Sequence, residues 1–330
     1  MDFLSQLKSD LDSKAIPKMV FEMFYHLHES YVATLTKAGI DYSEHIHMFD
    51  TYLRLVKEQL IDPYQFEPFH EKITSPFNYA EFGIELFRPM VDFEHSTLLH
   101  KKNLDEMQRQ VLAGDNVVFL ANHQTEVDPQ MMNLILEKNY SDLASKLIFV
   151  AGDRVVTDPL AIPLSLGCNL LCIFSKRHVE NPPEKKAQKL IHNQKTMKRM
   201  KQLLTEGGRA IYVAPSGGRD RPNTEGKLTL SAFDPQSVEM FRLMAKQAKR
   251  ATHFYPLALK TYGILPPPDT IVSDLGELRK PSRQGIHFAF GDELDMETFS
   301  GCNLKDRYAR RSALAMNVFN SVKTLYTELP

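Results

Sequence analysis

Residues 117–129 read VVFLANHQTEVDP and combine a buried strand, a polar loop and the start of a helix. The apolar run at the beginning is rich in β-branched and aromatic residues, which favours a strand. Asp128 and Pro129 predict a helix start, with Asp128 as the N-cap and Pro129 at the first helical position. We therefore expect His123 at the carboxyl end of a strand, where open α/β sheets bind their ligands.

His123 and Asp128 could form a pair across this turn. Their separation corresponds to about 140° around an ideal helix, so a regular helix would keep the two side chains apart. A strand–loop–helix turn lets them meet, and an aspartate bound to one imidazole nitrogen leaves the other nitrogen free as a base. The alternative is that Asp128 only caps a helix while His123 lies in a surface loop. The spacing alone does not separate these interpretations.

The composition is that of a globular protein. The chain has 330 residues, enough for a sizeable core and two domains. Its 43% hydrophobic and 25% charged residues are ordinary for such a protein. A net charge of −1 gives no overall field that would attract nucleic acid, so nucleic acid is not an expected partner. Anion binding must come from a local group of basic residues.

Cysteine content and targeting signals bear on the compartment. Cys168, Cys172 and Cys302 are too few for a disulfide framework and match no zinc spacing, so we expect reduced thiols in a reducing compartment. No apolar run reaches the roughly 18 residues of a transmembrane helix. The first residues resemble neither a signal peptide nor a transit peptide. We expect a soluble protein whose only membrane contact is peripheral.

Residues 1–75 are predicted to form a small N-terminal helical bundle. Apolar residues recur at helical spacing around 4–11, 19–38 and 42–60. The region also holds His26, His28, His45 and His47, which raises the question of a metal site. Residues two apart on a helix point about 200° apart, so neither pair can chelate a metal alone. We interpret them as core and surface histidines.

Residues 76–330 are predicted to form an α/β domain, with a mixed β-sheet covered by helices. Strand-like runs alternate with helix-like stretches, as is typical of this class. Close spacing of the last strands predicts that part of the sheet is antiparallel. The expected strands are 117–121, 147–151, 170–174, 210–214, 254–259, 271–275 and 286–290, and the expected helices are 104–112, 130–138, 184–204, 238–249 and 305–327.

Polar and basic residues follow four consecutive predicted strands. In chain order these groups are His123 with Asp128, Asp153 with Arg154, Lys176 with Arg177 and His178, and Arg219 with Arg221. The last two alternate around Asp220, so in an extended loop they point to one side. Arginine forks suit phosphate oxygens. Together the groups predict a cationic pocket for a small phosphorylated ligand beside a histidine base.

Residues 122–129 resemble the His-x4-Asp block of the glycerolipid acyltransferases. Over nearly its whole length the chain is similar to the soluble, plastid-type glycerol-3-phosphate acyltransferases. The similar strings are PFNY at 76–79, IFVAGDRV at 148–155, SKRH at 175–178, APSGGRDRP at 214–222 and FYPLA at 254–258. The fourth string is highly specific to the soluble branch. The resemblance implies a small helical bundle followed by a larger α/β domain, which the residue pattern also predicts.

The resemblance implies a reaction and a set of site residues. His123 and Asp128 would be catalytic, and Arg177, His178, Arg219 and Arg221 would hold the glycerol phosphate. The family commonly has lysine at position 177, where a planar fork here replaces a point charge. The reaction would move an acyl group from a thioester to the 1-hydroxyl of glycerol 3-phosphate, giving 1-acylglycerol 3-phosphate in the first step of phospholipid synthesis. His123 would take the hydroxyl proton and Asp128 would fix its tautomer, with no cofactor or metal.

The acyl donor could be acyl carrier protein or coenzyme A. Basic residues crowd the predicted helix 184–204, which in the simpler interpretation only exposes a solvated basic face. The functional interpretation is a docking face for acidic acyl carrier protein, or for an anionic membrane surface. Its candidate residues are Lys185, Lys186, Lys189, Lys195, Lys198 and Arg199.

Two other functions stay open at this point. The chain could acylate another phosphate-bearing acceptor such as 1-acylglycerol 3-phosphate, although the strings of the soluble branch argue against it. It could also be a non-catalytic glycerol-phosphate-binding protein. We expect a monomer, located in a bacterial cytoplasm or, for a processed chain, in the plastid stroma.

Overall fold

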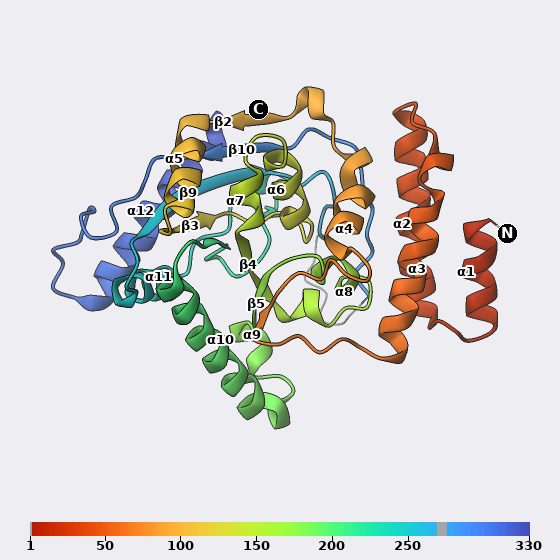
Figure 1. Ribbon diagram of the computed structural model, residues 1–330, viewed down its shortest axis with the longest axis horizontal. Helices are drawn as coiled ribbons and strands as arrows, with labels where there is room; N and C mark the ends of the chain where they lie inside the picture. The colour runs from red at the N-terminus through yellow and green to blue at the C-terminus, as the bar shows by residue number, and fades with distance from the viewer. Residues whose placement is uncertain (1, 269–275) are drawn as a thin grey trace.

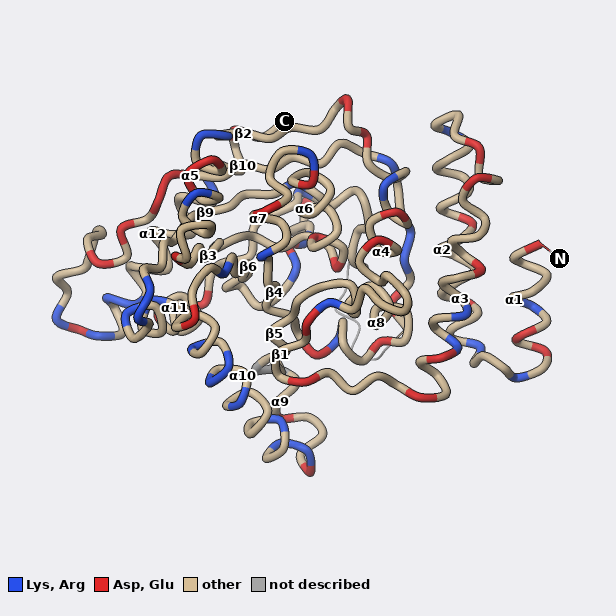
Figure 2. The backbone as a smooth tube through the Cα atoms, viewed as in Figure 1, with Lys and Arg blue, Asp and Glu red and all other residues tan. Residues whose placement is uncertain are grey.

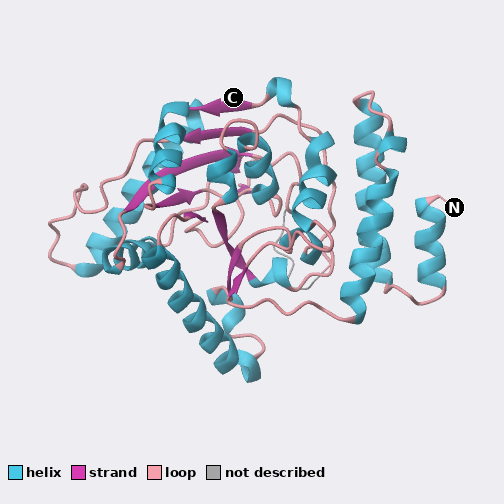
Figure 3. Cartoon of the chain, viewed as in Figure 1, coloured by secondary structure: helices cyan, strands magenta, loops and turns pink. Residues whose placement is uncertain are grey.

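The computed structural model describes residues 2–268 and 276–330, without the side chains of residues 176 and 177. Its centre is an eight-stranded sheet with helices on both faces, and further helices precede it in the chain (Figures 1 and 3). The predicted α/β class with a mixed, helix-covered sheet is confirmed. The expected strand at 271–275 lies outside the described residues.

The strand order in the sheet is β1-β5-β4-β6-β3-β9-β10-β2. Neighbouring parallel strands are β5 (Leu170–Ile173), β4 (Leu147–Gly152), β6 (Ala210–Val213), β3 (Asn116–Ala121) and β9 (Thr252–Lys260). As predicted, the end of the sheet is antiparallel, because β10 (His287–Phe290) pairs in that sense with β9. The edge strands are β2 (Thr97–Leu99), parallel to β10, and β1 (Phe69–His70), antiparallel to β5.

Alternate residues of β3 enter two separate cores, because successive side chains of a strand point to opposite faces. Val118 and Leu120 pack in a core with α10 (Lys186–Glu206), α11 (Pro235–Gln247) and α12 (Arg307–Glu328). Val117 and Phe119 pack in a core with α4 (Tyr79–Phe87), α5 (Lys101–Leu112) and α6 (Asp128–Leu136). Burial on both faces explains why this strand is a continuous apolar run.

The N-terminal helices α1 (Phe3–Asp12), α2 (Lys18–Lys37) and α3 (Ile46–Ile61) lie together at one end of the molecule (Figure 1). They join the second core, and the Tyr52 hydroxyl donates to the carbonyl of Leu160 at 2.5 Å. His28 is buried, with Nε2 2.8 Å from the Tyr42 hydroxyl, so it is a core histidine as interpreted. β1 joins the main sheet before residue 76, and the division of the chain into domains at that residue stays a prediction.

Several short elements complete the described chain. The remaining α-helices are α7 (Ser141–Ser145), α8 (Ile162–Ser165) and α9 (Lys176–Val179), and the separate two-stranded sheet consists of β7 (Arg221–Pro222) and β8 (Leu228–Thr229). The 3₁₀ turns are η1 (Tyr42–Glu44), η2 (Arg88–Met90), η3 (Phe93–His95), η4 (Asp153–Val156) and η5 (Pro183–Lys185). Across the described ranges, none of the helices is both long enough and apolar enough to pass through a bilayer.

Candidate active site

The four polar groups predicted at strand ends lie along one edge of the sheet. They follow β3, β4, β5 and β6, which are adjacent and parallel in the order β5-β4-β6-β3. Because parallel strands end at the same edge, the topology brings the loops after these strands to one side of the molecule. The topology therefore places all four loops at this edge, while the roles of their residues stay predictions.

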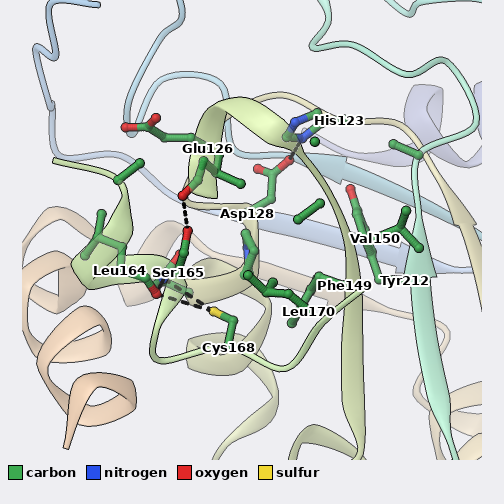
Figure 4. Close-up of a pocket in the computed structure, with 17 residues that line it drawn as sticks. His123, Glu126, Asp128, Phe149, Val150, Leu164, Ser165, Cys168, Leu170 and Tyr212 are labelled. Atoms are coloured by element: carbon green, nitrogen blue, oxygen red, sulfur yellow. Dashed lines mark hydrogen bonds and ion pairs between the residues drawn. The ribbon is translucent and has the colours of Figure 1, made fainter. Parts of the chain in front are cut away.

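His123 and Asp128 form a hydrogen-bonded pair. Nδ1 of His123 lies 2.7 Å from Oδ2 of Asp128. The Asp128 side chain is buried, whereas 29% of the His123 side chain is exposed. Figure 4 shows the carboxylate directed at the imidazole ring. The arrangement leaves Nε2 of His123 for another proton donor, as a general base requires.

The predicted role of Asp128 as helix N-cap is wrong by one position. α6 begins at Asp128 itself, and its N-cap is Val127, without a side-chain capping bond. The Asp128 carboxylate instead accepts from the backbone N–H groups of Gln124, at 2.9 Å, and Thr125, at 3.3 Å. These bonds turn it back toward the loop and His123, which rules out the interpretation that Asp128 only caps a helix.

Thr261 completes the shell around this carboxylate. Its hydroxyl donates to Oδ1 of Asp128 at 2.6 Å, and its backbone N–H donates to Oε1 of Gln124 at 2.8 Å. Thr261 directly follows β9 and is 133 residues from Asp128 in the chain. Sequence reasoning missed it, because an isolated threonine after a strand carries no motif that connects it to the pair.

Asp220 joins two loops of the site. One is the histidine loop, residues 122–127 after β3, and the other is the arginine loop, residues 214–221 after β6. Its backbone N–H donates to the carbonyl of His123 at 2.6 Å. Its buried carboxylate accepts from Nδ2 of Asn122 at 2.9 Å and from the N–H of Ser231 at 2.8 Å. Burial raises the pKa of Asp220, and these hydrogen bonds partly oppose the shift. The two residues that flank Asp220 are Arg219 and Arg221, so both arginines are adjacent to a residue hydrogen-bonded to the backbone of His123.

Arg219 forms a two-pronged ion pair with Glu277. Nη1 and Nη2 lie 2.7 Å from the two carboxylate oxygens, and Nη1 of Arg154 lies 3.8 Å from one of them. Burial alone would lower the pKa of Arg219, but the hydrogen bonds that it donates to Glu277 raise it. Burial, and then the charge of Arg219, lower the pKa of Arg221. The charge of one arginine thus acts on the other.

Arg279 forms an ion pair with Glu126 in the histidine loop. Its buried guanidinium pairs with Glu126 through Nε and Nη2, and Nη2 also lies 3.1 Å from Oδ2 of Asp158. Burial opposes ionisation of Glu126, yet the charges of Arg279, Arg219 and Arg154 lower its pKa. Glu126 therefore carries its charge, with Arg279 as counterion.

His178 stands apart from these contacts. His178 lies in α9 after β5, and its Nδ1 is 2.9 Å from both carboxylate oxygens of Asp153. β5 is three strands from β3, roughly 14 Å at normal strand spacing. Among the described contacts, none links His178 to Arg219 or Arg221. The side chain of Arg177 lies outside the described residues, so its role and that of His178 stay predictions.

An apolar pocket extends from His123 between the sheet and α8 (Figure 4). Cys168 in its wall is fully buried, and burial raises the pKa of its thiol to about 12. Cys172 is likewise buried. Other residues around the pocket include Phe149, Val150, Val155, Leu164, Leu170 and Tyr212. The sequence did not identify this lining, because its residues come from four separate segments.

The basic residues predicted for donor docking lie mainly on α10, which projects from the molecule (Figure 2). Lys185 belongs to η5, one position before the helix. Lys189 donates to the carbonyl of His178 at 2.6 Å, and Arg199 pairs with Glu206 at 3.0 Å. The exposed members are Lys185, Lys186, Lys195 and Lys198, close to the exposed apolar side chains of Leu190 and Ile191.

Metal binding finds no support in the described part of the chain. It contains no group of three or more histidine, cysteine, aspartate or glutamate side chains that could hold an ion. The polar residues of the site instead pair with one another, as in the bonds of Asp128 to His123 and of Glu277 to Arg219.

Comparison with known proteins gives a consistent result. A family model described as Acyltransferase matches residues 99–260. The chain is 36% identical to the chloroplastic glycerol-3-phosphate acyltransferase of Spinacia oleracea, over 99% of this chain and 70% of that protein. The proteins of the same name from Carthamus tinctorius and Arabidopsis thaliana are 34% and 31% identical, over 99% and 98% of this chain and 72% and 71% of their own lengths. Similarity of this extent includes both the histidine loop and the arginine loop, and the chain belongs to the glycerol-3-phosphate acyltransferase family.

Proposed function

We propose that this glycerol-3-phosphate acyltransferase uses His123 as the base that activates the 1-hydroxyl of glycerol 3-phosphate. The hydroxyl oxygen attacks the thioester carbonyl while its proton passes to Nε2 of His123. The carbon–sulfur bond then breaks, and the imidazolium returns the proton to the leaving thiolate. Asp128 holds the Nδ1 proton and stabilises the imidazolium between the two steps.

The phosphate of the acceptor is proposed to bind Arg219 and Arg221, with Arg177 and His178 as further candidates. The observation that carries this proposal is the 2.6 Å hydrogen bond from the Asp220 N–H to the carbonyl of His123. It ties the arginine loop to the base, so a phosphate on these arginines can place its hydroxyl end near the imidazole. Such positioning supplies much of the rate in reactions of two substrates.

The first part of the acyl chain is proposed to lie in the apolar pocket beside His123. Phe149, Leu164 and Leu170 offer it a surface without charge, and the pocket begins at the catalytic pair. A thioester carbonyl at its mouth would face the hydroxyl that His123 deprotonates. The apolar wall favours a fatty acyl group over a polar one because transferring the chain out of water is favourable.

Thr261→Val is expected to lower kcat about tenfold while leaving the half-saturation concentration of glycerol 3-phosphate nearly unchanged. Valine keeps the volume of threonine but removes a hydrogen bond to the buried Asp128 carboxylate, a bond to a charged group worth about 1.5–3 kcal/mol. Steady-state kinetics measure both values. Thr261→Ser keeps the hydroxyl and should retain most activity, and an unchanged kcat in the valine variant would show that Thr261 does not position the pair.

The donor is proposed to be acyl carrier protein, docked on the exposed lysines of α10, and the enzyme is proposed to work as a monomer in the plastid stroma. The names of the relatives place those proteins in the chloroplast. The cationic surface of α10 complements an acidic carrier, and complementary charge speeds association. An anionic membrane surface is the competing partner for the same lysines, and the assay below separates the two.

Radiolabelled glycerol 3-phosphate with acyl carrier protein or coenzyme A thioesters tests the function. We expect 1-acylglycerol 3-phosphate as product, and no acylation of 1-acylglycerol 3-phosphate. Lys195→Glu/Lys198→Glu should lower kcat/KM roughly tenfold with the carrier donor at low salt but little with coenzyme A. Lys8→Glu/Lys37→Glu, with exposed lysines on α1 and α2, is the matched control. Equal losses with both donors would exclude carrier docking, and a loss confined to assays with anionic vesicles would select the membrane.

A further inference from the structure

Arg219, which we propose for the phosphate, already holds a carboxylate. Its Nη1 and Nη2 lie 2.7 Å from Oε1 and Oε2 of Glu277, respectively. Both side chains are almost buried, with exposed fractions of 13% and 11%. Two parallel hydrogen bonds from a guanidinium to two oxygens are also the geometry in which arginine binds phosphate. Glu277 thus occupies the donors that a phosphate would use.

The charges around this ion pair favour a stronger anion than one carboxylate. Arg154 lies 3.8 Å from Oε2 of Glu277, and the charge of Arg219 acts on Arg221. Glu126 also affects Arg219, but Glu126 is paired with Arg279. Glu277 therefore lies beside two cations, Arg219 and Arg154, whereas a phosphate monoester brings between one and two negative charges near neutral pH. The negative charge of the monoester therefore balances these arginines better than the single charge of the Glu277 carboxylate does.

We propose that Glu277 substitutes for the substrate phosphate while the site is empty, and that glycerol 3-phosphate displaces it from Arg219. The inference rests on the proposed function, because it takes Arg219 as a phosphate ligand. A nearly buried guanidinium without a partner would be costly. The ion pair with Glu277 therefore keeps Arg219 in its binding geometry. It also means that any phosphate must compete with the Glu277 carboxylate for Arg219.

The geometry allows the exchange without movement of the chain segment. The carbonyl of Glu277 accepts from Nη1 of Arg279 at 3.2 Å, and Arg279 is itself held by Glu126 and Asp158. The backbone at Glu277 is thus anchored, while its side chain can rotate about its own bonds. Arg154, already 3.8 Å away, offers the displaced carboxylate a second cation.

Glu277→Gln is expected to bind glycerol 3-phosphate and inorganic phosphate about tenfold more tightly than the unchanged protein, because a neutral amide competes less well for Arg219 than a charged carboxylate. Isothermal titration without acyl donor measures this directly. Glu277→Asp keeps the charge, but its shorter side chain cannot reach both nitrogens of Arg219 in the same way. Its affinity for phosphate should therefore fall between those of the unchanged protein and Glu277→Gln. Weaker phosphate binding in both variants would overturn the proposal and show that Glu277 serves only to hold Arg219.

Two further variants sharpen the test. Arg219→Ala/Glu277→Gln should bind phosphate no better than Arg219→Ala alone, because the acid acts through that arginine. Glu137→Gln is the matched control: Glu137 forms a similar fork with Arg88 at 2.6 and 3.0 Å on the surface, and its loss should leave phosphate binding unchanged. If Arg219→Ala leaves binding unchanged, the proposed phosphate site fails. If Arg219→Ala weakens binding while Glu277→Gln does not tighten it, the displacement alone fails.

Discussion

His123→Ala is expected to lower kcat by about 10²- to 10⁴-fold, the range typical of general acid–base catalysis. The bond of Nδ1 to Asp128 leaves Nε2 as the only imidazole nitrogen free for the substrate hydroxyl. Alanine leaves water as the base, and water removes a proton from an alcohol far less effectively. The half-saturation concentration of glycerol 3-phosphate should change much less, because the proposed phosphate ligands are retained.

Single-turnover and steady-state assays with radiolabelled glycerol 3-phosphate measure this loss. His123→Gln provides a comparison that keeps a polar side chain but no base. Asp128→Asn should also be impaired, since an amide cannot stabilise the imidazolium. The His28→Gln variant is the matched control, because His28 is a core histidine that contacts Tyr42 far from the loop. Turnover in His123→Ala equal to that of the unchanged protein would remove the base assignment.

Arg219→Ala is expected to raise the half-saturation concentration of glycerol 3-phosphate about 10- to 100-fold. A hydrogen-bonded contact with a charged group contributes roughly 1.5–3 kcal/mol, and about 1.4 kcal/mol corresponds to a factor of ten. At saturating acceptor, kcat should fall much less.

The measurement is a titration of acceptor at fixed donor concentration. Arg219→Lys keeps the positive charge but not the fork, and it should lie between alanine and arginine. Arg88→Ala removes a comparable fork at the surface and should leave the acceptor dependence unaltered. An unchanged acceptor dependence in Arg219→Ala would remove this arginine from the phosphate site.

Much of the sheet could be predicted because its parallel strands are buried on both faces. β3, β4, β5 and β6 each coincide with an expected apolar run to within one residue at each end. The short strands β1 and β2 and the helix α4 were not predicted. A strand of two or three residues has no periodicity of its own and exists only through its neighbours in the sheet.

The placement of the histidine–aspartate pair and of the two arginines of the candidate site was also predictable. His123 and Asp128 lie within one turn of chain, and Arg219 and Arg221 flank a single residue, so local spacing already brought each pair together. The predicted helix start was wrong by one residue, because an aspartate before proline is commonly an N-cap. Here the Asp128 carboxylate accepts instead from the preceding backbone N–H groups of Gln124 and Thr125. This orientation of the Asp128 carboxylate also involves the hydroxyl of Thr261, which follows strand β9.

The sequence by itself pointed to the pair His123 and Asp128, the basic groups at four strand ends and the family of the chain. Only the tertiary structure decided the partners: Thr261 on Asp128, Glu277 on Arg219 and Arg279 on Glu126, separated by 133, 58 and 153 positions along the chain. The physical reason is that electrostatic energy depends on the distance between charges in space and not on their order in the chain. Many acids could have served each arginine, and packing of the sheet selected their partners.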